Sequence, residues 1–171
     1  MPKFELNQTG IQFIKDLIES RSDKKLRLQL RDFHYADIAE IINELSSNQA
    51  TYLIKLLESD KTADALAEVD EDIREGILEN LSAKEIAEEI EELDTDDAAD
   101  LIGELPEERQ ERGMSQITDS EHLEDIKELL TYDEDKAGGL MAKELVKVEE
   151  GLSVLNCLYL LYTSPSPRDQ R

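Results

Sequence analysis

The sequence has no tryptophan and only 5% aromatic residues, so any core that it forms must be built from aliphatic side chains. Its single cysteine, Cys157, excludes an internal disulfide framework and fits a reducing compartment. Bases are also scarce, because 19 Lys and Arg stand against 42 Asp and Glu and give a formal net charge of -23. A chain this acidic repels nucleic acid and attracts cations or basic surfaces, so we expect no nucleic-acid partner.

Segments that would lead the chain to or across a membrane are missing too. The first ten residues, MPKFELNQTG, lack the basic and then apolar regions of a secretory signal, so we expect no signal peptide. The longest apolar run covers 154–162, is interrupted by Asn156, and is far shorter than the roughly 20 residues that cross a bilayer. We therefore expect this fragment to contain no membrane span.

Residue groupings that perform covalent chemistry are absent as well. His34 and His122 are far apart in the sequence, and Cys157 lies well beyond both. Neither a Gly-rich phosphate loop nor a Cys/His metal spacing occurs. We expect that the protein is not an enzyme and that its chemistry comes from carboxylates.

What the sequence does contain is an apolar repeat with a period of twelve residues. Because residues i and i+3 share one helix face, each repeat predicts a helix of roughly eight or nine residues followed by a short turn. Such short helices must stack to be stable, so the sequence predicts an all-α superhelix of 12-residue units, paired as 24 residues. Leu30 and Phe33 continue the phase upstream, and Glu91 is expected to face solvent. The sixteen apolar anchors are Ile42, Leu45, Ile54, Leu57, Leu66, Val69, Leu78, Leu81, Ile90, Leu93, Ile102, Leu105, Met114, Ile117, Ile126 and Leu129.

Changes in this pattern divide the chain into parts. One amphipathic helix containing Ile11, Ile14, Leu17 and Ile18 precedes the repeats and is followed by a charged stretch, 21–25, expected to be a turn. Later, Gly138-Gly139 breaks the helical phase, and alternation at 145–148 predicts the first strand of another domain. The predicted parts are an N-terminal helical extension (1–29), the superhelix (30–131), a linker (132–143), the truncated start of an α/β domain (144–158) and a basic, Pro/Ser-rich tail that matches neither domain (159–171).

The acidic residues concentrate at 85–108, where twelve of 24 residues are acidic and none is basic. Asp96 and Asp100 stand there at i and i+4, on one helix face. Asp100 shares its repeat phase with Glu40, Asp64 and Glu88, which predicts a row of carboxylates along one side of the superhelix. Oxygen ligands without His or Cys favour Mg²⁺ or Ca²⁺, although a solvated acidic face is the simpler interpretation.

Three segments carry a resemblance to a known family: HYADIAE at 34–40, DDAADLIGELPEE at 96–108 and YDEDKAGGLM at 132–141. They resemble the cytosolic N domain of the MgtE family of magnesium transporters, over about residues 30–158. AGGLM followed by the strand-like ELVKV resembles that family's passage from the N domain into its first CBS domain.

The resemblance implies a regulatory role, because in this family the N and CBS domains form a cytosolic Mg²⁺ sensor attached to a dimeric transmembrane channel. It implies a place at the cytoplasmic face of the cell membrane, with the CBS and transmembrane domains of the same transporter as partners and a homodimer at full length. Carried over by motif, the Mg²⁺ ligands are Asp64, Asp96 and Asp100, with Gly139 contributing through its backbone.

Two other functions stay open at this point. One is an acidic α-solenoid scaffold that binds proteins, resembling the short-helix array of flagellar motor switch proteins. The other is a free-standing regulator with N and CBS domains and no pore. A strand after AGGLM favours the transporter over the scaffold, and long apolar segments beyond a CBS pair would separate the transporter from the free regulator.

Overall fold

The computed structural model describes residues 7–132, 136–138, 141, 143 and 151–163. Within these residues it has eleven α-helices and no strand, which confirms the all-α prediction. The helices are α1 (Gln8–Glu19), α2 (Asp23–Leu30), α3 (Tyr35–Asn43), α4 (Ser47–Leu56), α5 (Ser59–Glu68), α6 (Glu71–Asn80), α7 (Ala83–Ile90), α8 (Thr95–Gly103), α9 (Glu107–Met114), α10 (Ser120–Leu129) and α11 (Val154–Thr163).

Helices α2 to α9 begin at intervals of twelve residues, and α10 begins one residue late. Polar N-cap residues fix several of these starts. At α7, the Ser82 hydroxyl accepts a hydrogen bond from the Glu85 N–H and the Glu85 carboxylate accepts one from the Ser82 N–H, which is a capping box. At α10, the Asp119 carboxylate accepts from two backbone N–H groups of the first turn. The predicted twelve-residue phase is therefore confirmed.

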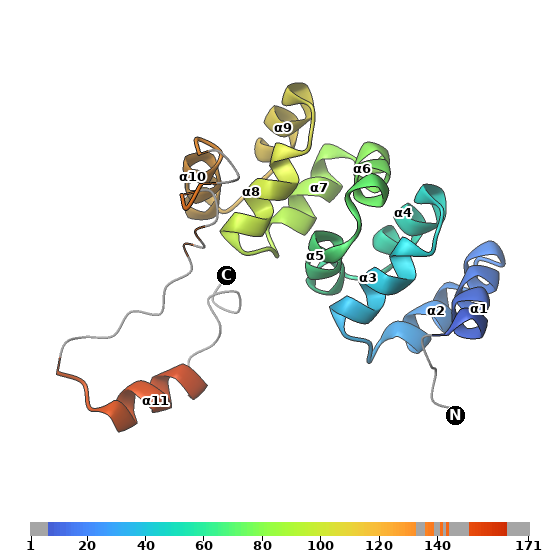
Figure 1. The fold of residues 1–171 in the computed structure, drawn as a ribbon, viewed down its shortest axis with the longest axis horizontal. Helices are drawn as coiled ribbons and strands as arrows, with labels where there is room; N and C mark the ends of the chain where they lie inside the picture. The colour runs from blue at the N-terminus through green and yellow to red at the C-terminus, as the bar shows by residue number, and fades with distance from the viewer. Residues whose placement is uncertain (1–6, 133–135, 139–140, 142, 144–150, 164–171) are drawn as a thin grey trace.

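From α3 to α10, each helix packs mainly against a helix two places away along the chain. Thus α3 packs on α5, α5 on α7 and α7 on α9, while α4 packs on α6 and α8 on α10. The structural unit is a pair of helices, or 24 residues, as predicted. Successive pairs stack into the elongated array of Figure 1, with α1 and α2 at one end and α10 at the other.

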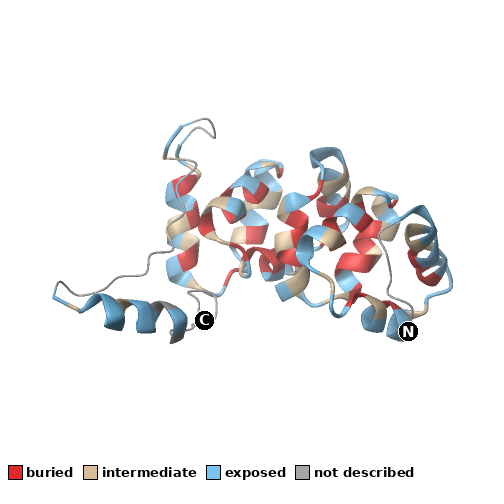
Figure 2. Ribbon diagram, turned by 60° about the horizontal axis from the view of Figure 1, so that its bottom comes forward, coloured by how far each residue is buried: buried red, intermediate tan, exposed pale blue. Residues whose placement is uncertain are grey.

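The apolar anchors meet in a single core that runs along the array (Figure 2). Fourteen of the sixteen are buried, and the other two, Leu57 and Met114, are partly buried against the same core. Complete burial of a Leu or Ile side chain stabilises a fold by about 1.5–3 kcal/mol, whereas helices of this length are marginal in isolation. Stacking therefore holds the array together.

The N-terminal end differs from the prediction in one respect. The amphipathic helix is present as α1, with Ile14, Leu17 and Ile18 buried. The charged stretch 21–25 is not a simple turn, because α2 begins at Asp23 and continues through it. Leu26 and Leu30, both fully buried, anchor α2 to the core in spite of its charged surface. The helical repeat therefore begins at residue 23, in the part expected to be an extension.

The C-terminal part is described only in places. The predicted strand at 145–148 lies outside the described residues. Helix α11 continues across Leu158 and Tyr159, where the sequence placed a boundary between two parts. It lies apart from the array in Figure 1, and most of its large apolar side chains are exposed. In the portion of the chain that the structure covers, no helix is long and apolar enough to cross a bilayer.

Candidate functional site

The predicted pair of ligands lies on α8. Four apolar side chains of this helix face the core, namely Ala98, Ala99, Leu101 and Ile102. Their burial turns the acids of the helix outward, so that Asp96 is half-buried and Asp100 is exposed. Asp96 is in the first turn, where the positive end of the helix dipole stabilises a carboxylate. Asp96 and Asp100 share one helix face, as their spacing predicted.

The predicted row of carboxylates is divided between two sets of helices. Glu40, Asp64 and Glu88 lie on α3, α5 and α7, which pack on one another in succession. Asp100 lies on α8, which packs on α10. Residues twelve positions apart lie on the two different helices of one pair. Only residues 24 positions apart therefore lie on helices that pack mainly on each other. The prediction of one continuous row is therefore wrong.

This division bears on the predicted ligand set. Asp64 is half-buried on α5, which packs on α3 and α7. The Asp96–Asp100 pair lies on α8, which packs on α10. Gly139 lies outside the described residues. Among the residues that are described, no three His, Cys, Asp or Glu side chains converge on one point where they could hold a metal ion. The structure thus brings Asp96 and Asp100 onto one face and does not group them with Asp64.

The last residue of the predicted linker, Lys143, is held at the start of α8. The Lys143 N–H donates to the Thr95 hydroxyl oxygen at 3.1 Å, and Thr95 is the residue directly before Asp96. The Lys143 ammonium pairs with Asp125 at 3.1 Å and with Glu128, both on α10. The hydrogen bond to Glu128 and the pairing with Asp125 raise the pKa of Lys143. Lys143 therefore fastens the end of the AGGLM junction to two helices beside the acidic pair.

Glu91 has a structural role that the sequence analysis missed. Its carboxylate accepts hydrogen bonds from the Thr118 N–H, from the Thr118 hydroxyl at 2.7 Å and from the Asp119 N–H at 3.3 Å. Partial burial opposes ionisation, but these hydrogen bonds outweigh it and lower the pKa of Glu91. The expectation that Glu91 simply faces solvent is wrong, since the residue fixes the loop before α10.

A second acidic site, an acidic pocket of about 330 Å³, lies between α4, α5 and α7. Glu89 lines the acidic pocket and is only 6% exposed. Its two carboxyl oxygens lie 2.9 and 2.8 Å from the Thr62 hydroxyl. Burial, assisted by the neighbouring charges of Glu88 and Glu92, raises the pKa of Glu89 to about 8 in spite of the Thr62 hydrogen bond. The other residues that line the acidic pocket are Ile54, Lys55, Leu57, Glu58, Ser59, Leu81, Glu85 and Glu88.

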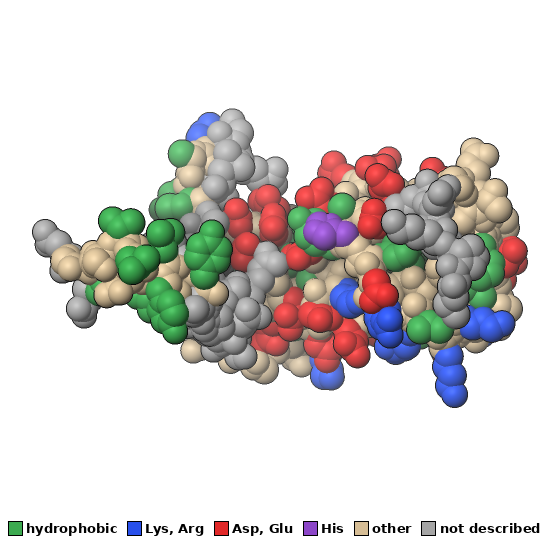
Figure 3. Space-filling model, turned by 90° about the horizontal axis from the view of Figure 1, so that it is seen from below, with side chains coloured by type: hydrophobic (Ala, Val, Ile, Leu, Met, Phe, Trp, Pro, Cys, Tyr) green, Lys and Arg blue, Asp and Glu red, His purple; other side chains and the backbone are tan. Residues whose placement is uncertain are grey.

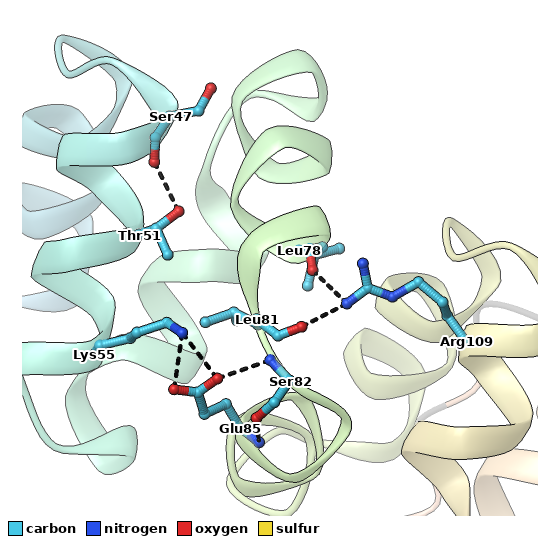
Figure 4. Close-up of polar contacts among 8 residues, drawn as sticks. All are labelled: Ser47, Thr51, Lys55, Leu78, Leu81, Ser82, Glu85 and Arg109. Atoms are coloured by element: carbon cyan, nitrogen blue, oxygen red, sulfur yellow. Dashed lines mark hydrogen bonds and ion pairs between the residues drawn. The ribbon is translucent and has the colours of Figure 1, made fainter.

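Glu85, one turn before Glu89 on the same helix, behaves in the opposite way. Figure 4 shows its carboxylate between the Lys55 ammonium of α4 and the Ser82 N–H. Partial burial would raise its pKa, but the hydrogen bonds from Ser82 and Lys55 outweigh burial and lower the pKa of Glu85 to about 2. The acidic pocket therefore holds one carboxylate that is firmly ionised and one that retains its proton near neutral pH.

Glu89 could have been found from the repeat itself. Its position in the twelve-residue phase is occupied by a buried residue in six of the other repeats, and by the half-buried Gln29 and Asp125 at the two ends of the array. An acid at such a position predicts a buried carboxyl group. The pattern of two anchors per repeat, here Ile90 and Leu93, did not include the position before the first anchor. The six buried residues are Ile41, Leu53, Ala65, Ile77, Leu101 and Gly113.

Comparisons with known proteins agree with this fold. The chain matches the family model of the MgtE intracellular N domain over residues 33–135. The crystal structure of the soluble part of a magnesium transporter has a TM-score of 0.76 and 23% identity, covering 89% of this chain and 60% of that one. The crystal structure of the cytosolic domain of the Mg²⁺ channel MgtE in complex with ATP has a TM-score of 0.74 and 27% identity, covering 89% and 62%.

This chain spans about three fifths of the length of those two solved proteins. No curated protein matches it. The family match includes more than half of the chain and two of the three segments that carry the resemblance, and it begins at Phe33, two residues before α3. The chain therefore belongs to the MgtE intracellular N domain family, as its sequence motifs predicted.

Proposed function

We propose that this chain is the Mg²⁺-sensing regulatory part of a magnesium transporter or channel, and that the Asp96–Asp100 face of α8 binds the ion. The observation that carries the proposal is the hydrogen bond between Lys143 and Thr95. This hydrogen bond holds Lys143, in the segment after the helical array, directly beside Asp96. An ion bound at this face would therefore act where the domain connects to whatever follows it.

The donor set suits magnesium. Mg²⁺ retains several waters and is usually held by one or two carboxylates, without a cage of protein ligands. An exposed i,i+4 pair of Asp side chains can provide such a site, and Gly139 could add a backbone oxygen. Asp64 belongs to a separate set of helices, so we propose it as a ligand of a second, independent ion.

The proposed mechanism follows from charge. At low magnesium the acidic face repels an acidic surface of the CBS domains, and at high magnesium hydrated ions between the two surfaces draw them together. A millimolar dissociation constant corresponds to only about 4 kcal/mol per ion, so several weak sites are needed to shift a gate decisively. The CBS domains, the transmembrane domain and a second subunit of the same transporter, at the cytoplasmic face of the membrane, are the proposed partners.

The direct test is magnesium-dependent thermal stability of the chain with Asp96→Ala and Asp100→Ala. The parent should gain stability with rising Mg²⁺, and the double variant should lose part of that gain by linkage. Without magnesium the variant should stay close to the parent in stability, because it loses the repulsion between the two carboxylates and also the attraction of Asp96 to the helix dipole. In a full-length transporter the same change should leave conduction intact and weaken its closure by magnesium.

The matched control is Glu107→Ala with Glu111→Ala, which removes an exposed i,i+4 pair of acids from the neighbouring helix α9. This control should keep the full magnesium response. If both pairs reduce the response equally, magnesium interacts with the whole acidic surface and the named ligands are wrong. That result would leave the acidic protein-binding scaffold as the better description.

A further inference from the structure

The charge of this acidic chain is unevenly distributed. Residues 1–31 contain seven Lys and Arg and four Asp and Glu, a net charge of +3, so the remaining 140 residues carry -26. In Figure 3 the blue Lys and Arg side chains gather toward the N-terminal end of the face shown, and the red acidic side chains lie over its centre. The chain is therefore a long acidic body with a basic end.

Part of that basic end surrounds an apolar pocket. The pocket has a volume of about 310 Å³ and is lined by Arg27, Leu28, Leu30 and Arg31 near α2, and by Leu57, Glu58 and Lys61 near α5. Lys24 stands one turn before Leu28 and so lies on the same helix face. We call Lys24, Arg27, Leu28, Arg31 and Lys61 the basic patch.

Three carboxylates, those of Asp23, Asp32 and Glu58, adjoin the four cations of the basic patch, which leaves an excess of positive charge. Asp23 stands one turn before Arg27 on α2 and accepts a hydrogen bond from the Tyr52 hydroxyl. Glu58 lines the pocket, and Asp32 pairs with the Arg31 guanidinium at 3.1 Å. The side chains of Arg31 and Asp32 are 66% and 79% exposed, so this pair is weak and the guanidinium can exchange Asp32 for another anion. Phosphate is a favourable replacement, because a guanidinium can bind it with two parallel hydrogen bonds.

Leu28 gives the basic patch its second property. This side chain is 53% exposed in the middle of four cationic side chains, next to the apolar floor of the pocket. An exposed aliphatic residue surrounded by Lys and Arg on a helix is the composition of segments that rest on the interface of an anionic bilayer. We propose that the basic patch docks the N-terminal end of this domain onto an anionic phospholipid surface.

A second copy of the chain is a poorer fit to the basic patch, although it would also supply negative charge. Among the described residues, no large hydrophobic side chain between Tyr35 and Tyr132 is exposed, so the acidic helices of the array have no apolar group to place against Leu28. Two acidic bodies would also repel each other. On a membrane, α5 would reach the bilayer through Lys61, whereas the acidic helices from α7 onward, stacked beyond α5, would lie farther away than the Debye length of about 8 Å, since one helix is about 10 Å wide.

The inference rests on the proposed attachment to a membrane transporter only for the presence of a bilayer nearby. Its test uses vesicles and does not depend on magnesium. The full 171-residue chain should sediment with vesicles of phosphatidylcholine mixed with phosphatidylglycerol, should remain in solution with phosphatidylcholine alone, and should dissociate at high salt. Arg27→Glu with Arg31→Glu should lower the partition coefficient at least roughly tenfold, and Leu28→Ser should lower it by a smaller factor.

The control is Arg112→Glu with Lys127→Glu, which makes the same change of charge on exposed residues of α9 and α10. It should alter binding less than about twofold, because those residues lie far from the bilayer. Circular dichroism should verify that each variant is folded. If the Arg27/Arg31 variant is not, Lys24→Gln with Lys61→Gln replaces it and should also weaken binding.

Four results would overturn the proposal. The first is absence of binding to the anionic vesicles. The second is equal binding to neutral vesicles, which would indicate partitioning of the exposed apolar side chains of α11. The third is an equal loss of binding in the Arg112/Lys127 control. The fourth is reduced self-association of the Arg27/Arg31 variant in analytical ultracentrifugation with vesicle binding unchanged, which would make the basic patch a contact between copies.

Discussion

The Thr62 hydroxyl oxygen on α5 lies 2.9 and 2.8 Å from the two carboxyl oxygens of Glu89 on α7, and 3.3 Å from the backbone carbonyl oxygen of Glu58. A hydroxyl has one hydrogen, so Thr62 cannot donate to a carboxylate and to this carbonyl at the same time. If Glu89 is protonated, it donates to Thr62 and Thr62 donates to Glu58. The geometry therefore agrees with the raised pKa of Glu89, and this residue is a neutral acid near pH 7.

Glu89 should make the stability of the chain fall as the pH rises from about 4.5 to about 8. Between these values an unfolded chain has released the Glu89 proton and the folded chain retains it, so folding becomes less favourable with rising pH. The slope from this group is at most about 1.4 kcal/mol per pH unit. Glu89→Gln keeps a neutral side chain that can donate to Thr62. Urea unfolding across this range should show a flatter profile for the variant and higher stability at pH 8.

Glu88→Gln is the control for Glu89, because it removes one exposed charge from the same helix. Its profile should keep most of the parent's slope. An unchanged slope in Glu89→Gln would show that Glu89 is ionised throughout the range. The lowered pKa values of Glu85 and Glu91 act in a separate window, since the stability they contribute is lost only as the pH falls below about 4.5.

Arg109 should contribute strongly to stability. Its guanidinium donates to the backbone carbonyls of Leu78 at 2.8 Å and Leu81 at 2.6 Å (Figure 4). It also donates to the Glu79 carbonyl at 2.9 Å, and so caps the C-terminal end of α6. Arg109→Met leaves these carbonyls without their cationic donor, and we expect a loss of about 2–3 kcal/mol in urea unfolding. Arg109→Lys should recover less than half of this lost stability, because an ammonium cannot reproduce the planar, forked donors of a guanidinium.

Arg112 provides the comparison for Arg109 on the same helix. It pairs with Glu108 at 2.7 Å, but both side chains are more than two-thirds exposed, at 68% and 77%. Arg112→Met should therefore change the free energy of unfolding by less than about 0.5 kcal/mol. Equal losses for the two substitutions would mean that overall charge, and not the capping of α6, determines the effect.

The fold was largely predictable because the repeat is regular. Twelve residues allow one short helix and one turn, and the i,i+3 anchors determine which face is buried, so helix positions and the paired unit followed directly. The start of α2 was not predictable in the same way. Its charged residues 23–25 resemble a turn in isolation, and tertiary packing of Leu26 and Leu30 is what makes them helical.

The candidate site was less predictable, because a period along the sequence does not say which helices are neighbours. The carboxylate row was assigned with a period of twelve, whereas packing in pairs gives a period of 24. The roles of Glu91 and Lys143 depend on contacts with residues 27 and 48 positions away, Thr118 and Thr95. Such contacts have no signature in local spacing.

Glu91 should be much less tolerant of substitution than its neighbour Glu92. Glu91→Ala removes the acceptor for the Thr118 and Asp119 N–H groups, and we expect a loss of about 1–2 kcal/mol in urea unfolding. Glu92 is exposed, and Glu92→Ala should cost less than about 0.5 kcal/mol. Near-identical losses for the two would restore the original view of Glu91 as a solvent-facing residue.

Thr95→Val should loosen the attachment of the linker to α8. The side chain is only 1% exposed, and valine matches its shape while removing the acceptor for the Lys143 N–H. Loss of one hydrogen bond of about 1 kcal/mol should make amide exchange at Lys143 roughly fivefold faster. Lys143→Met, which removes the ion pairs with Asp125 and Glu128, should accelerate it as well. Lys127→Met, on the exposed side of α10, should leave the rate of amide exchange at Lys143 unchanged.

The same Thr95→Val variant connects this contact to the proposed function. If magnesium acts at Asp96 beside a linker held in place, its stabilising effect on the chain should weaken in the variant although every carboxylate is still present. Amide exchange at Lys143 should also become slower with added Mg²⁺ in the parent, and less so in the variant. A full magnesium response in Thr95→Val, together with fast exchange at Lys143, would separate ion binding from the linker. The ion would then bind without acting on the position where the domain connects to the rest of the transporter.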